Sequence, residues 1–276
     1  MSGCIKPDWW DRLRKNSAVK LNMKSPEQKA KEVFGERAAF YTTSPAHTDA
    51  QVLARVVELA GPQSNWSVLD IATGTGHTAF ALSPHVASVI GIDLTPEMLR
   101  EAELLKARLS AANVVFRIAD VHDLPFSDAS FNLATCRRAA HHFSDIQRAL
   151  QEIRRVMAPG GRVVIDDRSV PEDDFVDQCM NWLDTLHDES HVREYRRSEW
   201  KRMLEEAGFG MEVIETYVRH RPLSALTRGV SEQNVNRINE TLASLTPAQR
   251  ESFQLVEKDG ELYLNHWFVL AAALKE

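Results

Sequence analysis

From about residue 46 to the end of the chain, hydrophobic and polar positions form two kinds of pattern, helical spacing and short apolar runs. Val52, Val56 and Ala60 recur at the spacing of one helix face, and Gly61-Pro62 marks the end of that helix. Short apolar runs between turn residues predict strands at 66–71, 88–92, 113–118, 131–136, 162–166, 211–218 and 262–270. Helical spacing predicts further helices at 77–82, 96–109, 146–157, 175–186, 198–207, 231–242 and 246–256. Strands that alternate with helices indicate an α/β fold, with a parallel sheet covered by helices on both faces.

The helix at 96–109 has the most explicit start signal. Thr95 offers a hydroxyl at the N-cap, Pro96 occupies the first helical position, and Glu97 places an acid in the first turn. The expected buried stripe of this helix is Met98, Leu99, Ala102, Leu105 and Leu109. Between the two last strands lies a segment of about 40 residues that is too apolar for a linker, and we expect it to pack over one end of the sheet.

Composition narrows the class of protein. The chain has 276 residues, of which 43% are hydrophobic and 26% charged, so it can bury a core without metals or disulfides. A formal net charge of −6 argues against a protein that binds nucleic acid through phosphates. The longest apolar run, 267–274, is too short to span a membrane, and the first ten residues lack the zones of a signal peptide. We therefore expect a cytoplasmic protein with neither nucleic acid nor a membrane as partner.

Cysteine and histidine usage predicts no metal site. Cys4, Cys136 and Cys179 are odd in number and far apart, which suits a reducing compartment. The segment 1–37 is rich in Lys and Arg, and we interpret it as a solvated arm, although the adjacent Trp9 and Trp10 are unusual in such an arm. Met23 is an alternative start of the chain.

A glycine turn follows the first strand, in the segment 70–79. Gly74 and Gly76 let a ligand approach the backbone, and the next helix presents free N–H groups. The turn matches the dinucleotide fingerprint, so an NAD-dependent oxidoreductase is one interpretation. Asp70 favours a second interpretation, a site for a cationic ligand, because a carboxylate near this turn repels a pyrophosphate but attracts an ammonium or sulfonium group.

Two more acids end the second and third strands. The carboxylate of Asp93 can accept hydrogen bonds from two ribose hydroxyls, and that of Asp120 from an adenine amino group. Together with Asp70 they place three acids at the carboxyl ends of neighbouring strands. This arrangement suits a cationic nucleoside.

These segments resemble those of class I S-adenosylmethionine-dependent methyltransferases, and most of all the branch of the ubiquinone and menaquinone C-methyltransferases. The resemblance rests on residues 68–76, 91–93, 119–120 and 157–161. It implies a doubly wound, seven-stranded Rossmann-like sheet that is mostly parallel, with the last strand antiparallel. It also implies an N-terminal arm and lid at 1–45, in which Phe40 and Tyr41 close on the cofactor, and a methyltransferase domain at 46–276 with a helical insertion at about 221–261.

The same resemblance implies S-adenosylmethionine as cofactor and S-adenosylhomocysteine as product. Asp70 and the glycine turn would hold the methionine end, Asp93 the ribose, and Asp120, Val121 and Met98 the adenine. The expected cofactor-binding residues are Tyr41, Asp70, Ala72, Thr73, Gly74, Gly76, Asp93, Leu94, Met98, Asp120, Val121 and Arg137. Ala72-Thr73 departs from the Gly or Cys of many relatives, and we expect this difference only to tighten the turn.

The segment 136–143 follows the fourth strand and would face the methyl acceptor. It lacks the Asn-Pro-Pro-Tyr type of motif that holds planar amides, which argues against nucleic-acid bases and protein glutamines as acceptors. His142 is the first candidate for a general base and His141 the second. Because adjacent side chains point in different directions, we expect one of them in the pocket and the other in a structural role.

Charged residues offer further candidates on the acceptor side. Arg137 or Arg138 can hold an anionic acceptor or pair with Asp166 or Asp167. His191, Arg193 and Tyr195 either cover the acceptor pocket or belong to a solvated charged loop.

The function predicted from the sequence is methyl transfer to carbon or oxygen of a small, largely apolar acceptor of aromatic, quinone-like or polyketide-like type. Two alternatives remain at this point, an NAD-dependent oxidoreductase and a cofactor-binding module that does not methylate, because a fold does not determine a reaction.

Overall fold

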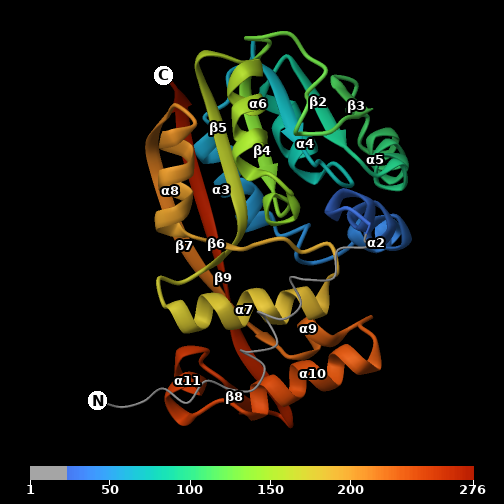
Figure 1. Ribbon diagram of the computed structural model, residues 1–276. Coiled ribbons are helices and arrows are strands. Elements are labelled where there is room, and N and C mark those ends of the chain that lie inside the picture. The colour runs from blue at the N-terminus through green and yellow to red at the C-terminus, as the bar shows by residue number, and fades with distance from the viewer. Residues whose placement is uncertain (1–23) are drawn as a thin grey trace.

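The structure, a computed structural model, describes residues 24–276. Trp9, Trp10 and Met23 lie outside the described residues. The solvated arm expected at 1–37 is wrong for its described part, because residues 26–37 belong to the helix Pro26–Tyr41. Seven strands form the main path of one sheet in the order β3-β2-β1-β4-β5-β9-β7 (Figure 1). In chain order the strands are β1 (Ser67–Ile71), β2 (Ser88–Asp93), β3 (Val114–Ile118), β4 (Phe131–Arg137), β5 (Met157–Val170), β6 (Tyr195–Arg196), β7 (Phe209–Pro222), β8 (Val256–Lys258) and β9 (Glu261–Lys275).

The strand directions confirm the predicted class of fold. Strands β3, β2, β1, β4 and β5 are mutually parallel, and β9 is antiparallel to both of its neighbours, β5 and β7. Two short strands are additional to the expected seven: β6 pairs with β5, and β8 pairs with β9. The last strand is antiparallel, as expected.

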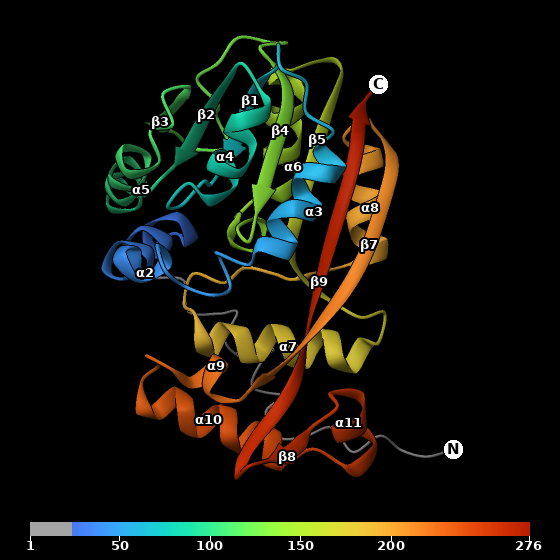
Figure 2. The ribbon, with the colours of Figure 1, turned by 180° about the vertical axis from the view of Figure 1, so that it is seen from behind.

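Helices cover both faces of the sheet. The helices of the described part are α2 (Pro26–Tyr41), α3 (Ala50–Ala60), α4 (His77–Leu82), α5 (Pro96–Leu109), α6 (Ile146–Val156), α7 (Asp174–His187), α8 (Arg197–Glu206), α9 (Ser224–Thr227), α10 (Glu232–Ala243) and α11 (Pro247–Ser252), with short 3₁₀ turns at Ser83–His85 and Ala140–His142. Helices α6 and α8 pack on one face, and α3 and α4 on the other (Figures 1 and 2). Each layer buries its own apolar cluster against the sheet.

Asp49 and Gly61 determine where α3 begins and ends. The carboxylate of Asp49 accepts hydrogen bonds from the backbone N–H groups of Gln51 and Val52 at 3.1 and 3.3 Å, which satisfies two free donors of the first turn. Gly61 ends the helix with φ = +51°, and a Cβ there would lie 2.8 Å from Nη1 of Arg162. A side chain at position 61 would therefore be strained as well as crowded.

Four local expectations were wrong. Thr95 is the N-cap of α5, as expected, but its hydroxyl makes no capping bond. Leu109 is 55% exposed, since α5 extends beyond the sheet at its C-terminal end. Strand β5 begins at Met157 and ends at Val170, so it is much longer than 162–166. The helix expected at 246–256 ends at Ser252, and β8 follows it.

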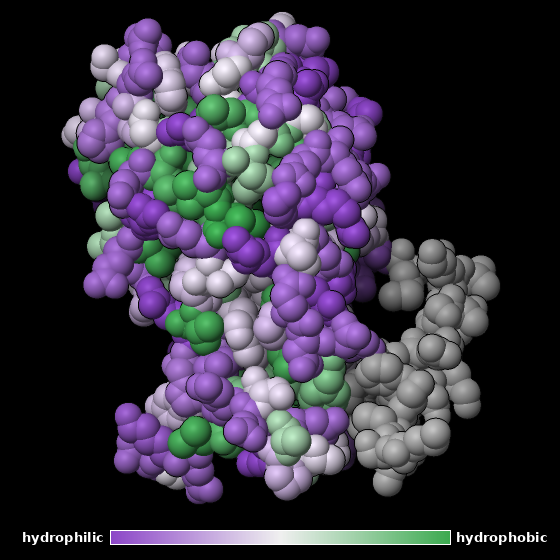
Figure 3. Space-filling model, turned by 90° about the vertical axis from the view of Figure 1, so that its left-hand side faces the viewer, coloured by the Kyte–Doolittle hydropathy of each residue, from purple (hydrophilic) through white to green (hydrophobic). Residues whose placement is uncertain are grey.

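The long strands β7 and β9 run past the parallel strands into the lower part of the molecule (Figure 2). There α7, α9, α10 and α11 pack around them and bury a third apolar cluster, which includes Leu183, Leu226, Ile238, Phe253 and Leu264. Figure 3 shows the side of β7 and α8, where apolar residues gather in the upper half and polar residues surround them. The insertion thus extends the sheet at one end.

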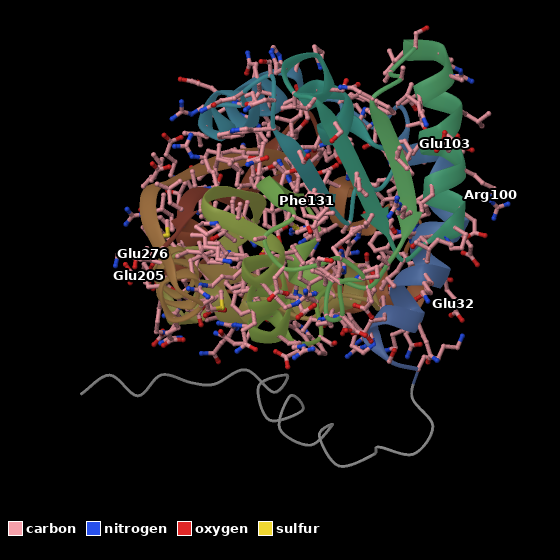
Figure 4. The ribbon with its side chains drawn as sticks, turned by 90° about the horizontal axis from the view of Figure 1, so that it is seen from above. Glu32, Arg100, Glu103, Phe131, Glu205 and Glu276 are labelled. Carbon is pink, nitrogen blue, oxygen red and sulfur yellow. The ribbon has the colours of Figure 1, made fainter. Side chains whose placement is uncertain are left out.

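The carboxyl ends of the parallel strands face α2 (Figure 2). Helix α2 packs against α5 and the 3₁₀ turn at Ala140–His142, so it lies across the edge where the expected site residues gather. Figure 4 shows the molecule from above, with Phe131, the first residue of β4, inside it and Arg100 and Glu103 on the outer side of α5. Within residues 24–276, no helix is long and apolar enough to cross a membrane.

Candidate active site

A cavity with about 1010 Å³ of empty space lies between α2 and the carboxyl ends of β1, β2 and β4. We call it the main cavity. Ten expected cofactor residues line it: Tyr41, Asp70, Ala72, Thr73, Gly74, Asp93, Leu94, Met98, Val121 and Arg137. Gly76 and Asp120 are not among the described residues that line it. The topology thus brings together residues up to 96 positions apart in the chain, from Tyr41 to Arg137.

The two glycines of the turn have different roles. Gly74 has φ = +55°, and a Cβ there would meet nothing within 4 Å, so its backbone borders open space. Gly76 has φ = +87°, and a Cβ there would lie 2.8 Å from the rings of Phe80 and Phe116. Gly74 therefore leaves room for a ligand, whereas Gly76 allows α4 to pack closely on the sheet.

Asp70 is almost completely buried, with 1% of its surface exposed. Its carboxylate accepts hydrogen bonds from the hydroxyls of Thr73 at 2.5 Å and Thr135 at 2.7 Å. Burial raises the pKa of Asp70, and the hydroxyls act against that shift. A buried carboxyl that is held by two hydroxyls and lines a cavity is suited to a cationic group of a ligand.

Asp93 is held by the backbone of the turn. Its Oδ2 accepts from the N–H of Gly74 and its Oδ1 from the N–H of Thr95, both at 2.9 Å. These bonds fix the carboxylate at the cavity wall and leave each oxygen a second lone pair. Desolvation raises the pKa of Asp93 and the backbone donors lower it. The geometry is suited to two ligand hydroxyls.

Arg137 contributes a donor that has no protein partner in the described part of the chain. Its Nε donates to the hydroxyl of Thr78 at 2.9 Å, and its Nη2 to the carbonyl of His47 at 2.7 Å. Nη1 is buried without a hydrogen-bond partner among residues 24–276. Because a buried unsatisfied donor is costly, Arg137 is poised to donate to a ligand, for which a carboxylate is the best acceptor.

Asp120 is engaged by His122 and is not among the described residues that line the main cavity. Its Oδ1 accepts from the backbone N–H of His122 at 2.9 Å and lies 2.7 Å from Nδ1 of the same residue. The neighbours Ala119, Val121 and His122 line the cavity instead, together with the buried Met98. This end of the cavity is mainly apolar and is suited to a flat ring.

The two adjacent histidines occupy different environments. His141 is buried, donates its backbone N–H to Oδ2 of Asp167 at 2.8 Å, and places its Nδ1 2.6 Å from Oδ1 of Asp167. Burial lowers the pKa of His141 well below its usual range and raises the pKa of Asp167 to about 6. His142 lines the main cavity and packs edge-on against Phe34, with ring centroids 5.0 Å apart.

Hydrogen bonds determine which nitrogen of His142 is protonated. Ser190 donates its hydroxyl to Oδ1 of Asp188 at 2.6 Å, so its Oγ, 3.1 Å from Nδ1 of His142, is an acceptor. The carbonyl of Ser190 lies 3.2 Å from the same nitrogen. Nδ1 therefore carries the proton in the neutral ring, and Nε2, which has no partner among the described residues, keeps its lone pair.

A second cavity, with about 670 Å³ of empty space, adjoins the first. The two cavities share Phe34, Tyr41, His47, Arg138 and His142 as lining residues. The second cavity is lined mostly by charged and histidine side chains, which are not the surroundings that the largely apolar acceptor expected from the sequence would need. In the described part of the chain, no group of His, Cys, Asp or Glu is arranged to hold a metal ion.

The remaining candidates for the acceptor side lie in different parts of the structure. Arg138 forms an ion pair with Asp166, with Nε 3.0 Å from Oδ2. His191 lines the second cavity. Arg193 pairs with Asp177 and Glu199, and neither Arg193 nor Tyr195 is among the described residues that line either cavity. The segment is a half-buried network of ion pairs and not a solvated loop.

Sequence reasoning missed several lining or supporting residues. Thr135, which holds Asp70, was detectable because it faces Asp70 in the register of β1 and β4. His47, Phe34 and Arg221 lie in segments without a recognisable motif, and they reach the cavities only through the packing of α2 and β7.

Comparisons with known proteins agree with this geometry. Residues 62–208, more than half of the chain, match the family described as "Methyltransferase domain". The uncharacterized methyltransferase YcgJ of Bacillus subtilis is 40% identical over 171 residues, which are 62% of this chain and 68% of YcgJ. The crystal structure of YcgJ aligns with a TM-score of 0.78 at 32% identity, over 82% of this chain and 98% of that one.

A second relative has a named reaction. The demethylmenaquinone methyltransferase of Thermus thermophilus is 41% identical over 113 residues, which are 40% of this chain and 51% of that protein. The shared family and fold exclude the oxidoreductase alternative. The chain therefore belongs to the methyltransferase domain family and is a class I S-adenosylmethionine-dependent methyltransferase.

Proposed function

We propose that the protein transfers a methyl group to carbon or oxygen of a small molecule of aromatic, quinone-like or polyketide-like type. The observation that carries this proposal is the pair of adjoining cavities that share His142, one fitted to a cationic nucleoside and the other open for an acceptor. The partial match to a demethylmenaquinone methyltransferase supports the class of acceptor.

The residues of the main cavity fit S-adenosylmethionine in three independent ways. The open space above Gly74 receives a ligand against the backbone, the carboxylate of Asp93 accepts from the ribose hydroxyls, and the unpaired Nη1 of Arg137 donates to the amino-acid carboxylate. Asp70 offers negative charge for the ammonium group. When bound, S-adenosylmethionine supplies an electrophilic methyl group on its sulfonium sulfur.

His142 is the general base of the proposal. Its Nε2 has a free lone pair because Nδ1 is committed to Ser190, and the side chain lines both cavities. It can therefore take the proton that a carbon or oxygen acceptor must lose as the new bond to the methyl carbon forms. The imidazolium ion that results is stabilised through Ser190 by the carboxylate of Asp188. His141 has a structural role in the proposal, because its Nδ1 is engaged by Asp167.

Binding measurements test the assignment of the cofactor. In calorimetry and thermal-shift experiments, S-adenosylhomocysteine should bind and stabilise the protein, whereas NAD should do neither. The carboxylate of Asp70 repels a pyrophosphate at this place and gives the physical reason for the difference. Equal stabilisation by both compounds would contradict the proposal.

A further inference from the structure

Three arginines line the second cavity, and two of them already have carboxylate partners. Arg138 pairs with Asp166, and Arg168 pairs with Asp184, at 3.0 and 2.7 Å. Glu194 is a second partner of Arg168 and is itself buried, which raises its pKa well above the usual range. These ion pairs leave little charge uncompensated around either guanidinium.

Arg221 differs from both of them. It lines the second cavity, and among residues 24–276 its guanidinium forms no ion pair with a carboxylate and donates no side-chain hydrogen bond. Its Cζ lies 5.5 Å from the centroid of the Phe268 ring. Burial, with Arg138 and Arg168 nearby, lowers the pKa of Arg221 to about 10, so it remains charged at neutral pH. A half-buried and unpaired cation at a cavity wall attracts an anion.

The carboxylates that line the same cavity do not compensate this charge. Asp184 is paired with Arg168, and Asp188 accepts from the backbone N–H and the hydroxyl of Ser190 at 2.8 and 2.6 Å. The pKa of His47, which lines this cavity, also indicates a positively charged environment. Burial and the charges of Arg137, Arg138 and Arg221 lower the pKa of His47 to about 3.

We propose that the second cavity is the acceptor site and that Arg221 selects an acceptor that carries an anionic oxygen group, a carboxylate or a phosphate, beside the position to be methylated. Arg221 and His142 line the same cavity, so one acceptor can contact both. Arg221 belongs to β7 and lies beyond the matched family region 62–208, so the family match does not extend to this residue. The inference rests on the proposed function, because it assigns the main cavity to the cofactor.

The test uses full-length protein saturated with S-adenosylhomocysteine and three probes: benzoate, phenyl phosphate and the neutral methyl benzoate. Calorimetry and ligand-observed NMR should show that at least one anion binds tenfold or more tightly than methyl benzoate, as expected for a charge-assisted hydrogen bond. The stronger of benzoate and phenyl phosphate identifies the type of oxyanion.

Variants show whether Arg221 causes this preference. Arg221→Gln should abolish the preference, and Arg221→Lys should restore part of it. Arg219→Gln is the matched control, because Arg219 lies on the same strand but pairs with Asp49 at 3.1 Å, and it should keep the wild-type preference. Affinity for S-adenosylhomocysteine and the melting temperature should be unchanged in Arg221→Lys.

The outcomes separate the two proposals. If wild-type protein does not bind S-adenosylhomocysteine, the proposed function is wrong. If it does, but the anions bind no better than methyl benzoate at millimolar concentration, only the role of Arg221 is wrong. An anion preference that survives in Arg221→Gln would likewise overturn that role.

Discussion

At the scale of single residues, the site depends on carboxylates and histidines whose partners differ from one to the next. Asp93 is fixed by two backbone donors, whereas Asp120, at the end of the neighbouring strand, is engaged by His122. His141 is tied to Asp167, whereas His142 keeps one ring nitrogen free. Residues of the same type therefore have different hydrogen-bond partners, and substitutions can distinguish their contributions.

The first prediction compares Asp93 with Asp120. Asp93→Ala removes the acceptor of two backbone N–H groups and of the ribose hydroxyls, which costs about 1–3 kcal/mol, so S-adenosylhomocysteine should bind tenfold or more weakly. Asp120→Ala is the control and should reduce affinity by much less, because Asp120 does not line the main cavity among the described residues. Isothermal calorimetry measures both. Equal losses in the two variants would place Asp120 at the ligand and contradict this geometry.

The second prediction compares the two histidines. His142→Ala should lower kcat by ~10²–10⁴-fold, the usual contribution of a general base, with the affinity for S-adenosylhomocysteine nearly unchanged. His141→Ala leaves Asp167 buried without its side-chain partner, so it should lower the free energy of unfolding by about 1–3 kcal/mol. Turnover on an acceptor found by screening and urea unfolding measure these effects. Full activity in both variants would exclude a base at this position and leave alignment alone as the source of the rate.

At the scale of elements, α2 is weakly anchored for a helix that covers a cavity. Ala38 is its one fully buried residue, and Phe34 and Tyr41 contribute their rings to the cavity walls. A helix that buries little apolar surface opens at low cost in free energy. The lid expected at 1–45 thus stays a prediction, in which α2 and the loop that follows it open and close over the main cavity.

The third prediction concerns this lid. Trypsin should cleave after Arg37 in the free protein and more slowly when S-adenosylhomocysteine is bound, because the ligand contacts Tyr41 and holds α2 closed. Cleavage after Lys258, in the exposed hairpin of β8 and β9, should be equally fast in both states and serves as the control. Equal rates at Arg37 with and without ligand would argue against a lid.

At the scale of the whole molecule, the second cavity and its surroundings bury many neutral histidines. Burial lowers the pKa of His47 to about 3 and of His191 to about 4, and it also lowers the pKa values of His77, His141, His187 and His266. In the unfolded chain these side chains titrate near pH 6.5. The folded state therefore binds fewer protons at mildly acidic pH.

The fourth prediction follows from this difference. Between pH 6.5 and about 4 the histidines bind protons in the unfolded state but not in the folded state, so the free energy of unfolding should fall as the pH falls. Asp70, Asp93, Asp167 and Glu194 act in the opposite direction, because burial raises their pKa values and their folded forms gain protons at a higher pH than the unfolded chain does. The six histidines outnumber these four carboxyl groups, so a net loss is expected, and each histidine whose pKa lies below 5 in the folded state contributes about 2 kcal/mol to the loss between pH 7 and pH 5.

Urea unfolding at several pH values tests this prediction. His191→Gln should reduce the loss of stability on acidification, because it removes one of the buried neutral rings. His220→Gln is the control and should leave the loss unchanged, since His220 is exposed on β7. A protein whose stability does not decrease toward pH 5 would contradict the burial of neutral histidines.

The sequence by itself determined the class of fold and indicated most of the expected residues that line the main cavity. Alternating strand and helix patterns require a parallel sheet, and parallel strands bring their carboxyl ends to one edge. Asp70, Gly74 and Asp93 follow directly from that rule, because each ends a strand or lies in the turn after it. Such residues are positioned by the backbone path, which local patterns encode.

Only the tertiary structure decided which side chains of that edge are available to a ligand. Asp120 is engaged by His122, Nδ1 of His141 is engaged by Asp167, and Arg221, 79 positions beyond His142, reaches the second cavity from β7. Whether a charged side chain has a partner depends on packing between distant segments and on the direction of each side chain, which no spacing in the sequence specifies. The polar character of the second cavity follows from this packing.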